Sequence, residues 1–89
     1  MDMPSDLSEP KQALWWLQAG ALSLGPDWLR AHEICQLQEG TRDYDLVHAL
    51  CHWIEGDLGN RDYWLRRAGA WLPAASVAEE WQAVSDAVS

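Results

Sequence analysis

The amino-acid sequence predicts an all-α fold, a compact bundle of about five short helices. No stretch of the chain alternates apolar and polar residues in the way a half-buried strand does. Several segments instead repeat apolar residues at helical spacing, and capping residues, glycine or proline bound each segment. The connections between these segments are short, so neighbouring helices should run antiparallel.

Length and composition indicate one domain with a packed core. The chain has 89 residues, of which 48% are hydrophobic and seven are tryptophans. Each buried tryptophan contributes a large contact area, which helps a chain of this length to fold. Residues 1–7 are polar and contain proline, so we expect them to fray and residues 8–89 to form a single helical domain.

The net charge of −8 narrows the classes of partner. Phosphate backbones and anionic membrane surfaces would be repelled, so neither nucleic acid nor a membrane is expected. The N-terminal segment lacks the basic and apolar regions of a signal peptide, and no apolar run could span a bilayer. Cys35 and Cys51 make no disulfide framework and are expected as buried free thiols. A cytoplasmic protein is the resulting expectation.

The first helix is expected over residues 8–24, with Ser8 as its cap and a stop at Gly25. It is apolar most of the way round, so it is either buried in the protein or covered by a partner. Trp15 and Trp16 are adjacent and cannot both point inward, which makes one of them a candidate interface residue. A homodimer formed through this helix is therefore expected.

The second helix is expected over residues 27–38, capped by Asp27, and the third from Thr41 or Asp43 to Glu55. A turn rich in glycine and aspartate follows the third helix. The third helix has one broad apolar face and, opposite it, a single polar stripe.

The fourth helix is expected over residues 61–71, capped by Asn60 and closed by Pro73. Ser76 and Glu79 form a capping box for the fifth helix. The fifth helix has the clearest periodic signal of the chain, a narrow apolar stripe. The residues of this stripe are Val77, Trp81, Val84 and Val88.

The polar stripe of the third helix provides a candidate metal site. His48 and His52 are four residues apart and Glu55 follows three residues later, so all three project from one helix face. A helix offers two nitrogen ligands to a metal such as zinc at this spacing. The second helix could supply a further ligand through His32. Other residues that could complete a polar pocket are Glu33, Asp45 and Asp57.

Other interpretations of these residues remain open. They can form an ordinary solvated polar face. They can also serve a metal-free enzyme, because a histidine beside a carboxylate transfers protons near neutral pH. No phosphate-binding glycine loop and no activated-serine motif indicates a substrate.

A second candidate surface is basic. Arg66 and Arg67 lie next to Tyr63 and Trp64 in the sequence, and an arginine–aromatic patch can bind carboxylates or an acidic segment of a partner. Charge balance at the end of a helix, where cations are favoured, explains the same arginines.

Residues 28–69 resemble a family of small bacterial proteins that is uncharacterised. The resemblance implies no particular reaction. It includes both histidines of the third helix, which favours a site there. The segments that carry it are AHEI at 31–34, HALCH at 48–52, EGD at 55–57, Asn60, YW at 63–64 and RRAG at 66–69.

The second half of this stretch also resembles one tetratricopeptide unit, a helical hairpin of a known repeat. No second unit is visible at the same period. The small and aromatic positions of the repeat fall, in the expected order, on Ala49, Gly56, Leu58, Leu65 and Ala68.

Four residues depart from the repeat. Arg61 stands where the repeat has a small residue, and Asp45, His48 and His52 stand where it has large apolar ones. The repeat alignment implies that both histidines pack against the fourth helix, whereas the amphipathic pattern turns them away from the core. A third helix covered on both sides would satisfy both patterns.

The preferred functional hypothesis is a small acidic helical interaction module that self-associates. The first alternative is a metal-binding or metal-dependent protein that uses His48, His52 and Glu55, with His32 nearby. The second alternative is a metal-free enzyme that uses the same histidines for acid–base chemistry.

Overall fold

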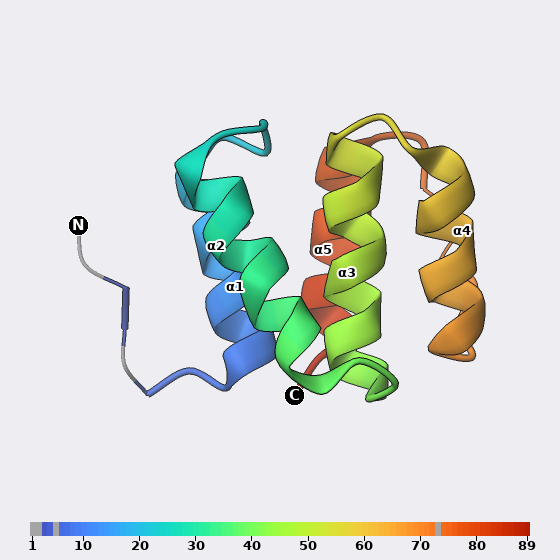
Figure 1. The fold of residues 1–89 in the computed structure, drawn as a ribbon, viewed down its shortest axis with the longest axis horizontal. Coiled ribbons are helices and arrows are strands. Elements are labelled where there is room, and N and C mark those ends of the chain that lie inside the picture. Colours follow the sequence, from blue (N-terminus) through green and yellow to red (C-terminus); the bar gives the residue numbers. More distant parts are fainter. Residues whose placement is uncertain (1–2, 5, 73) are drawn as a thin grey trace.

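A computed structural model describes residues 3–4, 6–72 and 74–89, and these form a bundle of five α-helices without strands (Figure 1). The predicted all-α bundle is confirmed. Within this described part of the chain, no helix is long and apolar enough to cross a membrane. The helices are α1 (Glu9–Ala19), α2 (Pro26–Cys35), α3 (Arg42–Ile54), α4 (Leu58–Arg67) and α5 (Val77–Ala87), and a short 3₁₀ helix, η1 (Gln36–Gln38), follows α2.

α3 is the central helix of the bundle. It packs against α1, α2, α4 and α5, whereas α4 lies at one edge and α1 and α2 form the opposite side (Figure 1). Every residue from 45 to 51 of α3 is buried. A helix covered on several sides buries part of its polar stripe, here Asp45 and His48, together with its apolar face, which reconciles the two conflicting expectations for this helix.

The hydrophobic core gathers around α3, and all five helices contribute to it or to its edge. Cys35 and Cys51 are free and buried, as the sequence predicts. Burying each large aliphatic side chain contributes about 1.5–3 kcal/mol relative to exposure. The buried apolar residues are Ala13, Leu14, Leu17, Ala31, Cys35, Leu46, Val47, Ala49, Leu50, Cys51, Trp64, Leu65, Ala68, Val84 and Val88.

The first helix ends several residues before its predicted end. α1 stops at Ala19, and Gly20 is its C-cap. Ala21 and Leu22 then take φ angles of 58° and 55°, and the Leu22 N–H donates to the Leu17 carbonyl. This closing turn supplies hydrogen bonds to carbonyls at the helix end. Composition alone does not reveal that the helix ends here.

The predicted cap of the second helix is wrong by two residues. The N-cap of α2 is Gly25, and Pro26 occupies the first helical position, where its missing N–H costs nothing. Asp27 lies in the first turn instead, where the helix dipole favours a negative charge, and its carboxylate accepts a hydrogen bond from Arg30.

The fourth helix begins and ends earlier than predicted. Its N-cap is Asp57, whose Oδ1 accepts the Asn60 N–H at 3.1 Å, so Asn60 lies inside the helix and is not its cap. The aspartate also accepts from the side-chain amide of Asn60. The predicted stop at Pro73 lies outside the described residues.

A buried ion pair joins α4 to α5. Arg61 donates to the carboxylate of Glu80 through both Nε, at 2.9 Å, and Nη2, and Glu80 is fully buried. Arg61 also donates to the Leu72 carbonyl at 3.0 Å. This pairing gives the Arg61 side chain a buried partner on α5.

Ser76 caps the fifth helix as predicted, but Glu79 reaches back to the N–H of Ala75 and not to that of Ser76 as in a capping box. The Glu79 N–H donates to the Ser76 hydroxyl at 3.2 Å. The Glu79 carboxylate accepts the Ala75 N–H at 2.7 Å. Farther along α5, the Trp81 indole donates to the Leu14 carbonyl at 2.9 Å, which ties α5 to α1.

Candidate metal site

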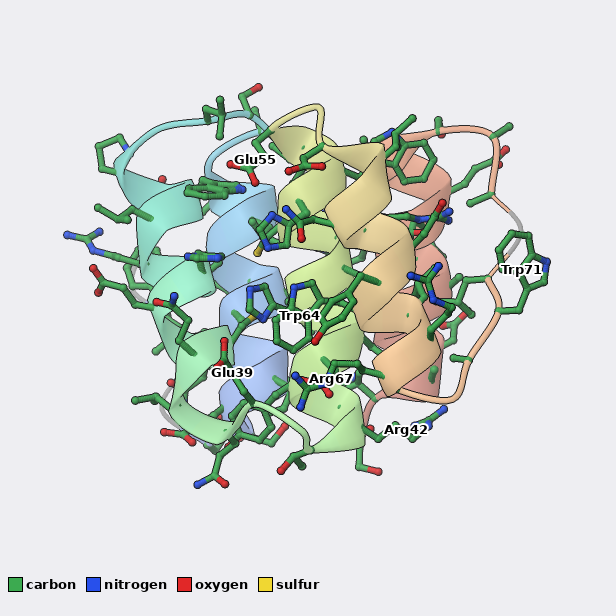
Figure 2. The ribbon with its side chains drawn as sticks, turned by 45° about the vertical axis from the view of Figure 1, so that its right-hand side comes forward. Glu39, Arg42, Glu55, Trp64, Arg67 and Trp71 are labelled. Carbon is green, nitrogen blue, oxygen red and sulfur yellow. The ribbon has the colours of Figure 1, made fainter. Side chains whose placement is uncertain are left out.

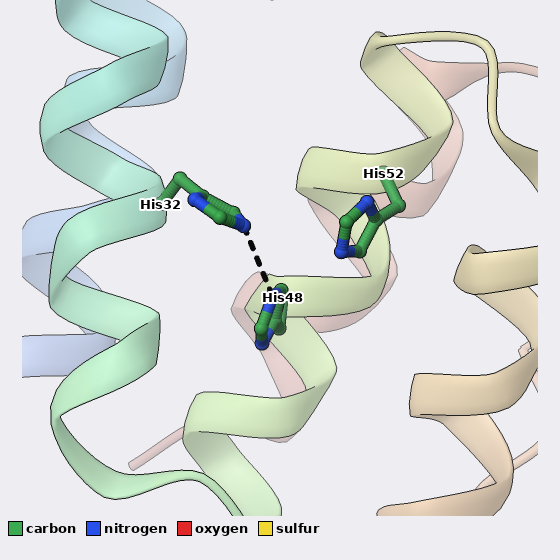
Figure 3. Close-up of side chains that lie close together, drawn as sticks. All are labelled: His32, His48 and His52. Carbon is green, nitrogen blue, oxygen red and sulfur yellow. Dashed lines mark hydrogen bonds between the residues drawn. The ribbon is translucent and has the colours of Figure 1, made fainter.

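Three histidines from two helices meet between α2 and α3 (Figure 3). His32 comes from α2, and His48 and His52 come from α3; we name this group the histidine triad. One ring nitrogen of each lies within 4.8 Å of the other two, and the Nε2 atoms of His32 and His48 are 3.1 Å apart. The structure thus brings together all three histidines that the sequence singled out.

Helix periodicity and the packing of α2 on α3 position the triad. The four-residue spacing of His48 and His52 stacks their rings, with centroids 4.9 Å apart. On α2, Trp28 lies four residues before His32 and stacks on it with centroids 5.0 Å apart and planes 7° apart. The Trp28 indole also donates to the Cys51 carbonyl at 2.9 Å, which fixes the position of α2 along α3.

His48 is the buried member of the triad, with 2% of its surface exposed. Trp64 from α4 stacks on its ring, with centroids 4.0 Å apart. Its Nδ1 atom has no hydrogen-bond partner among the described residues, and the Glu39 carboxylate lies 4.0 Å away. The expectation that this histidine packs against the fourth helix is met.

Electrostatics keep two of the imidazoles neutral. Burial, together with the neighbouring His32, His52 and Arg67, lowers the pKa of His48 to about 3. Burial, followed by His52, also lowers the pKa of His32. Both rings therefore keep a free nitrogen lone pair at neutral pH, the state in which histidine binds a metal.

Glu55 orients His52 from outside the triad. Its carboxylate pairs with His52 Nδ1, so this nitrogen carries the proton and Nε2 is the nitrogen left for a ligand. Histidines that bind metals almost always donate their other N–H to a carboxylate, carbonyl or water. Glu55 therefore has the place of an outer carboxylate instead of the direct ligand that the sequence predicts.

One pair of nitrogens in the triad has the separation of two ligands on a metal ion, and the third nitrogen lies within 4.8 Å of both. Zinc–nitrogen bonds of about 2.0–2.1 Å place two nitrogens of a tetrahedral ion roughly 3.3 Å apart, and the His32 and His48 nitrogens are 3.1 Å apart. Imidazole nitrogens suit zinc, copper or nickel, whereas magnesium and calcium prefer oxygen ligands.

None of the other predicted pocket residues joins the three nitrogens of the triad. Asp57 caps α4, as described above, although its carboxylate, Glu55 and His52 also come within 4.8 Å of one another. Asp45 is fully buried, and its Oδ1 accepts the Gly40 N–H at 3.1 Å. Burial raises the pKa of Asp45. Glu33 is exposed on α2, beside a shallow cavity of about 310 Å³.

The predicted partner-binding residues make contacts within the chain. Trp15 and Trp16 are both half-buried and meet edge to face, with centroids 5.0 Å apart. The Arg30 guanidinium lies 4.6 Å from the Trp16 ring. Arg66 and Arg67 are exposed near the end of α4. A homodimer formed through the first helix stays a prediction.

Sequence reasoning did not assign three neighbours of the triad to the site. Trp28 and Trp64 stack on its rings, and Glu39 lies near His48. The four-residue spacing of Trp28 and His32 could have revealed the first stacking pair. Glu39 lies between η1 and α3, where no periodicity applies.

The chain matches no protein-family model, no curated protein and no solved structure. The resemblances to small bacterial proteins and to a single tetratricopeptide unit stay predictions.

Proposed function

We propose that this chain is a metal-binding protein that holds one divalent transition-metal ion through His32, His48 and His52. Zinc fits the ligand set well, because three imidazoles are a common set of protein ligands for it. The observation that carries the proposal is the convergence of three ring nitrogens, from two helices, within 4.8 Å of one another.

The cost of the arrangement supports this function. The buried His48 ring turns its Nε2 atom toward the Nε2 atom of His32 at 3.1 Å, and burying polar groups of this kind costs free energy. Apolar side chains at the same positions would avoid this cost. A bound ion would recover free energy from the ring nitrogens that now face one another.

The interaction-module hypothesis has less support from geometry. Its candidate residues Trp16 and Arg67 are engaged within the chain, by Arg30 and by Trp64 respectively. The carboxylate on His52 Nδ1, in contrast, is the kind of outer contact that supports a metal-binding histidine.

Zinc titration of the metal-free protein tests the proposal. The titration uses protein without a histidine tag, and competition with a chromophoric chelator measures the affinity for zinc. We expect one equivalent of zinc to bind to the wild type and to Gln18→Ala, a control on the exposed side of α1. We expect His52→Ala, which replaces a partly exposed ligand, to lose more than the roughly 10–100-fold typical of outer-contact changes.

Circular dichroism shows whether His52→Ala keeps its helices. Equal affinity of wild type and His52→Ala for zinc, copper and nickel would contradict the proposal. Failure of the folded wild type to bind any of these ions would contradict it as well.

A further inference from the structure

The triad supplies three ligand atoms, one fewer than a closed metal site has. Among the described residues, no further cysteine, histidine, aspartate or glutamate places a ligand atom within 4.8 Å of all three nitrogens. Structural zinc sites are closed by four protein ligands, whereas sites that exchange ligands keep one position open. The triad therefore has the ligand number of an exchanging site.

The nearest carboxylates are occupied or lie on the wrong side. Glu55 pairs with His52 Nδ1, and Asp57 accepts two hydrogen bonds from Asn60. Glu39 approaches the Nδ1 side of His48, away from the nitrogen that faces His32. Glu55 and Asp57 would lose these hydrogen bonds on becoming the fourth ligand, and Glu39 would have to move to the other side of the His48 ring.

The site is closed at one end and open at the other. His48 is sealed by Trp64, and its side chain is 3% exposed. The His52 side chain is 14% exposed, and His32 is also partly exposed. An ion held by the three rings would therefore meet solvent on the side of His32 and His52.

Negative charge surrounds this opening. The Glu55 carboxylate pairs with His52 Nδ1, the Asp57 carboxylate comes within 4.8 Å of both, and Glu33 follows His32 on α2. Figure 2 shows Glu55 on one side of Trp64, with Glu39 and Arg67 on the other. The net charge of −8 adds to the same field. A bound ion attracts an anion, the carboxylates at the opening repel it, and a neutral ligand feels neither effect strongly, so the carboxylates shift the preference toward neutral donors.

We propose that an ion bound by the histidine triad keeps one coordination position open to solvent, and that this position takes small neutral nitrogen donors in preference to anions. This inference rests on the metal-binding function proposed above. A water molecule occupies the position when no donor is present, and the donor displaces it.

Cobalt(II) provides the test, because its visible absorption reports coordination number and ligand type. Cobalt-loaded, tag-free protein is titrated with imidazole and, separately, with azide as the anionic probe. We expect imidazole to change the absorption bands with single-site saturation. Gel filtration in imidazole, followed by metal analysis, checks that the cobalt stays with the protein.

Charge variants test the preference for neutral donors. Glu33→Gln removes a carboxylate near the opening, and Asp86→Asn removes one on α5 as a matched control. We expect azide to bind roughly two- to fivefold more tightly to Glu33→Gln than to wild type, from the loss of one Coulomb repulsion across water. Imidazole affinity should stay the same in all three proteins.

The outcomes separate the two proposals. If neither cobalt nor zinc binds, the metal-binding function itself is wrong. If cobalt binds stoichiometrically and neither imidazole nor azide alters its spectrum, the ion is closed by protein ligands and only this inference is overturned. Azide affinity that is equal in Glu33→Gln and wild type, or tighter than imidazole affinity, would overturn the preference for neutral donors.

Discussion

Trp64 lies nearly flat against His48, with ring centroids 4.0 Å apart and planes 18° apart. The indole comes from α4 and the imidazole from α3, so one aromatic contact joins the helical hairpin to the histidine triad. The Arg67 guanidinium lies 4.9 Å from the Trp64 ring. Packing of α4 and burial of the site therefore depend on the same side chain.

Replacing this tryptophan should strongly destabilise the protein. Trp64→Ala removes a buried indole, and such truncations lower the free energy of unfolding by about 3–5 kcal/mol. Trp64→Phe keeps an aromatic ring, so its free energy of unfolding should fall by less. Urea unfolding monitored by circular dichroism measures both. Trp71 is 72% exposed, so the control Trp71→Ala should stay within about 0.5 kcal/mol of wild type. Equal losses for Trp64→Ala and Trp71→Ala would contradict the stacking.

The metal-free protein should lose stability as the pH falls below about 6.5. The folded-state pKa of His48 is lowered to about 3, so between pH 6.5 and pH 3 the unfolded chain binds the proton that the folded chain refuses. Each pH unit in this window lowers the free energy of unfolding by roughly 1.4 kcal/mol. His32, His52, Glu39 and Arg67 face this ring, and the lowered pKa of His32 acts in the same direction.

Unfolding by urea between pH 6.5 and 5 measures this slope, in a range where most carboxylates stay ionised. His48→Gln cannot titrate there and should show a flatter pH dependence. The raised pKa of Glu80 acts in the opposite sense at pH values above the ordinary 4.5, because the folded state there holds the extra proton. A slope that is the same in His48→Gln and wild type would contradict the assignment to His48.

Zinc should stabilise the folded protein. A ligand that binds only the folded state adds about 2.7 kcal/mol at a free concentration one hundred times its Kd. Thermal unfolding at several zinc concentrations should show a rising Tm, and a chelator should reverse the rise. A Tm that is the same with and without zinc, copper or nickel would contradict binding by the triad.

Loss of the outer carboxylate should weaken the metal without unfolding the protein. Glu55→Gln replaces the carboxylate that pairs with His52 Nδ1, and such contacts are worth about 10–100-fold in metal affinity. Asp86→Asn on α5 is the control and should bind zinc like wild type. Competition with a chromophoric chelator measures both. An unchanged affinity in Glu55→Gln would show that the carboxylate does not orient the ligand.

The buried pair of Arg61 and Glu80 should behave as a coupled unit. Arg61→Met leaves a carboxylate buried without its cation and should cost about 3–5 kcal/mol of unfolding free energy. The double variant Arg61→Met/Glu80→Met removes both charges and should recover much of this loss. A double-mutant cycle by urea unfolding measures the coupling, and losses that simply add would contradict the pairing.

The sequence predicted the helix content and the three histidines, because both follow from spacing along one chain. The predicted end of α1 and the predicted cap of α4 were wrong. Gly20 closes α1 and Asp57 caps α4 through contacts that depend on the turn conformation. Glu55 was expected as a direct ligand, since periodicity places it on the face of His52 but does not decide which nitrogen it meets. The stacking of Trp64 on His48 could not be predicted, because it depends on how α4 packs against α3.

The edge position of α4 has a consequence for the local motions of the bundle. Among the described residues its backbone packs against α3, whereas α3 also meets three other helices. Amide hydrogens of α4 should therefore exchange with solvent sooner than those of α3, through openings that leave the rest of the bundle folded. A metal that joins α2 to α3 should slow exchange in those two helices and leave the rate in α4 nearly unchanged.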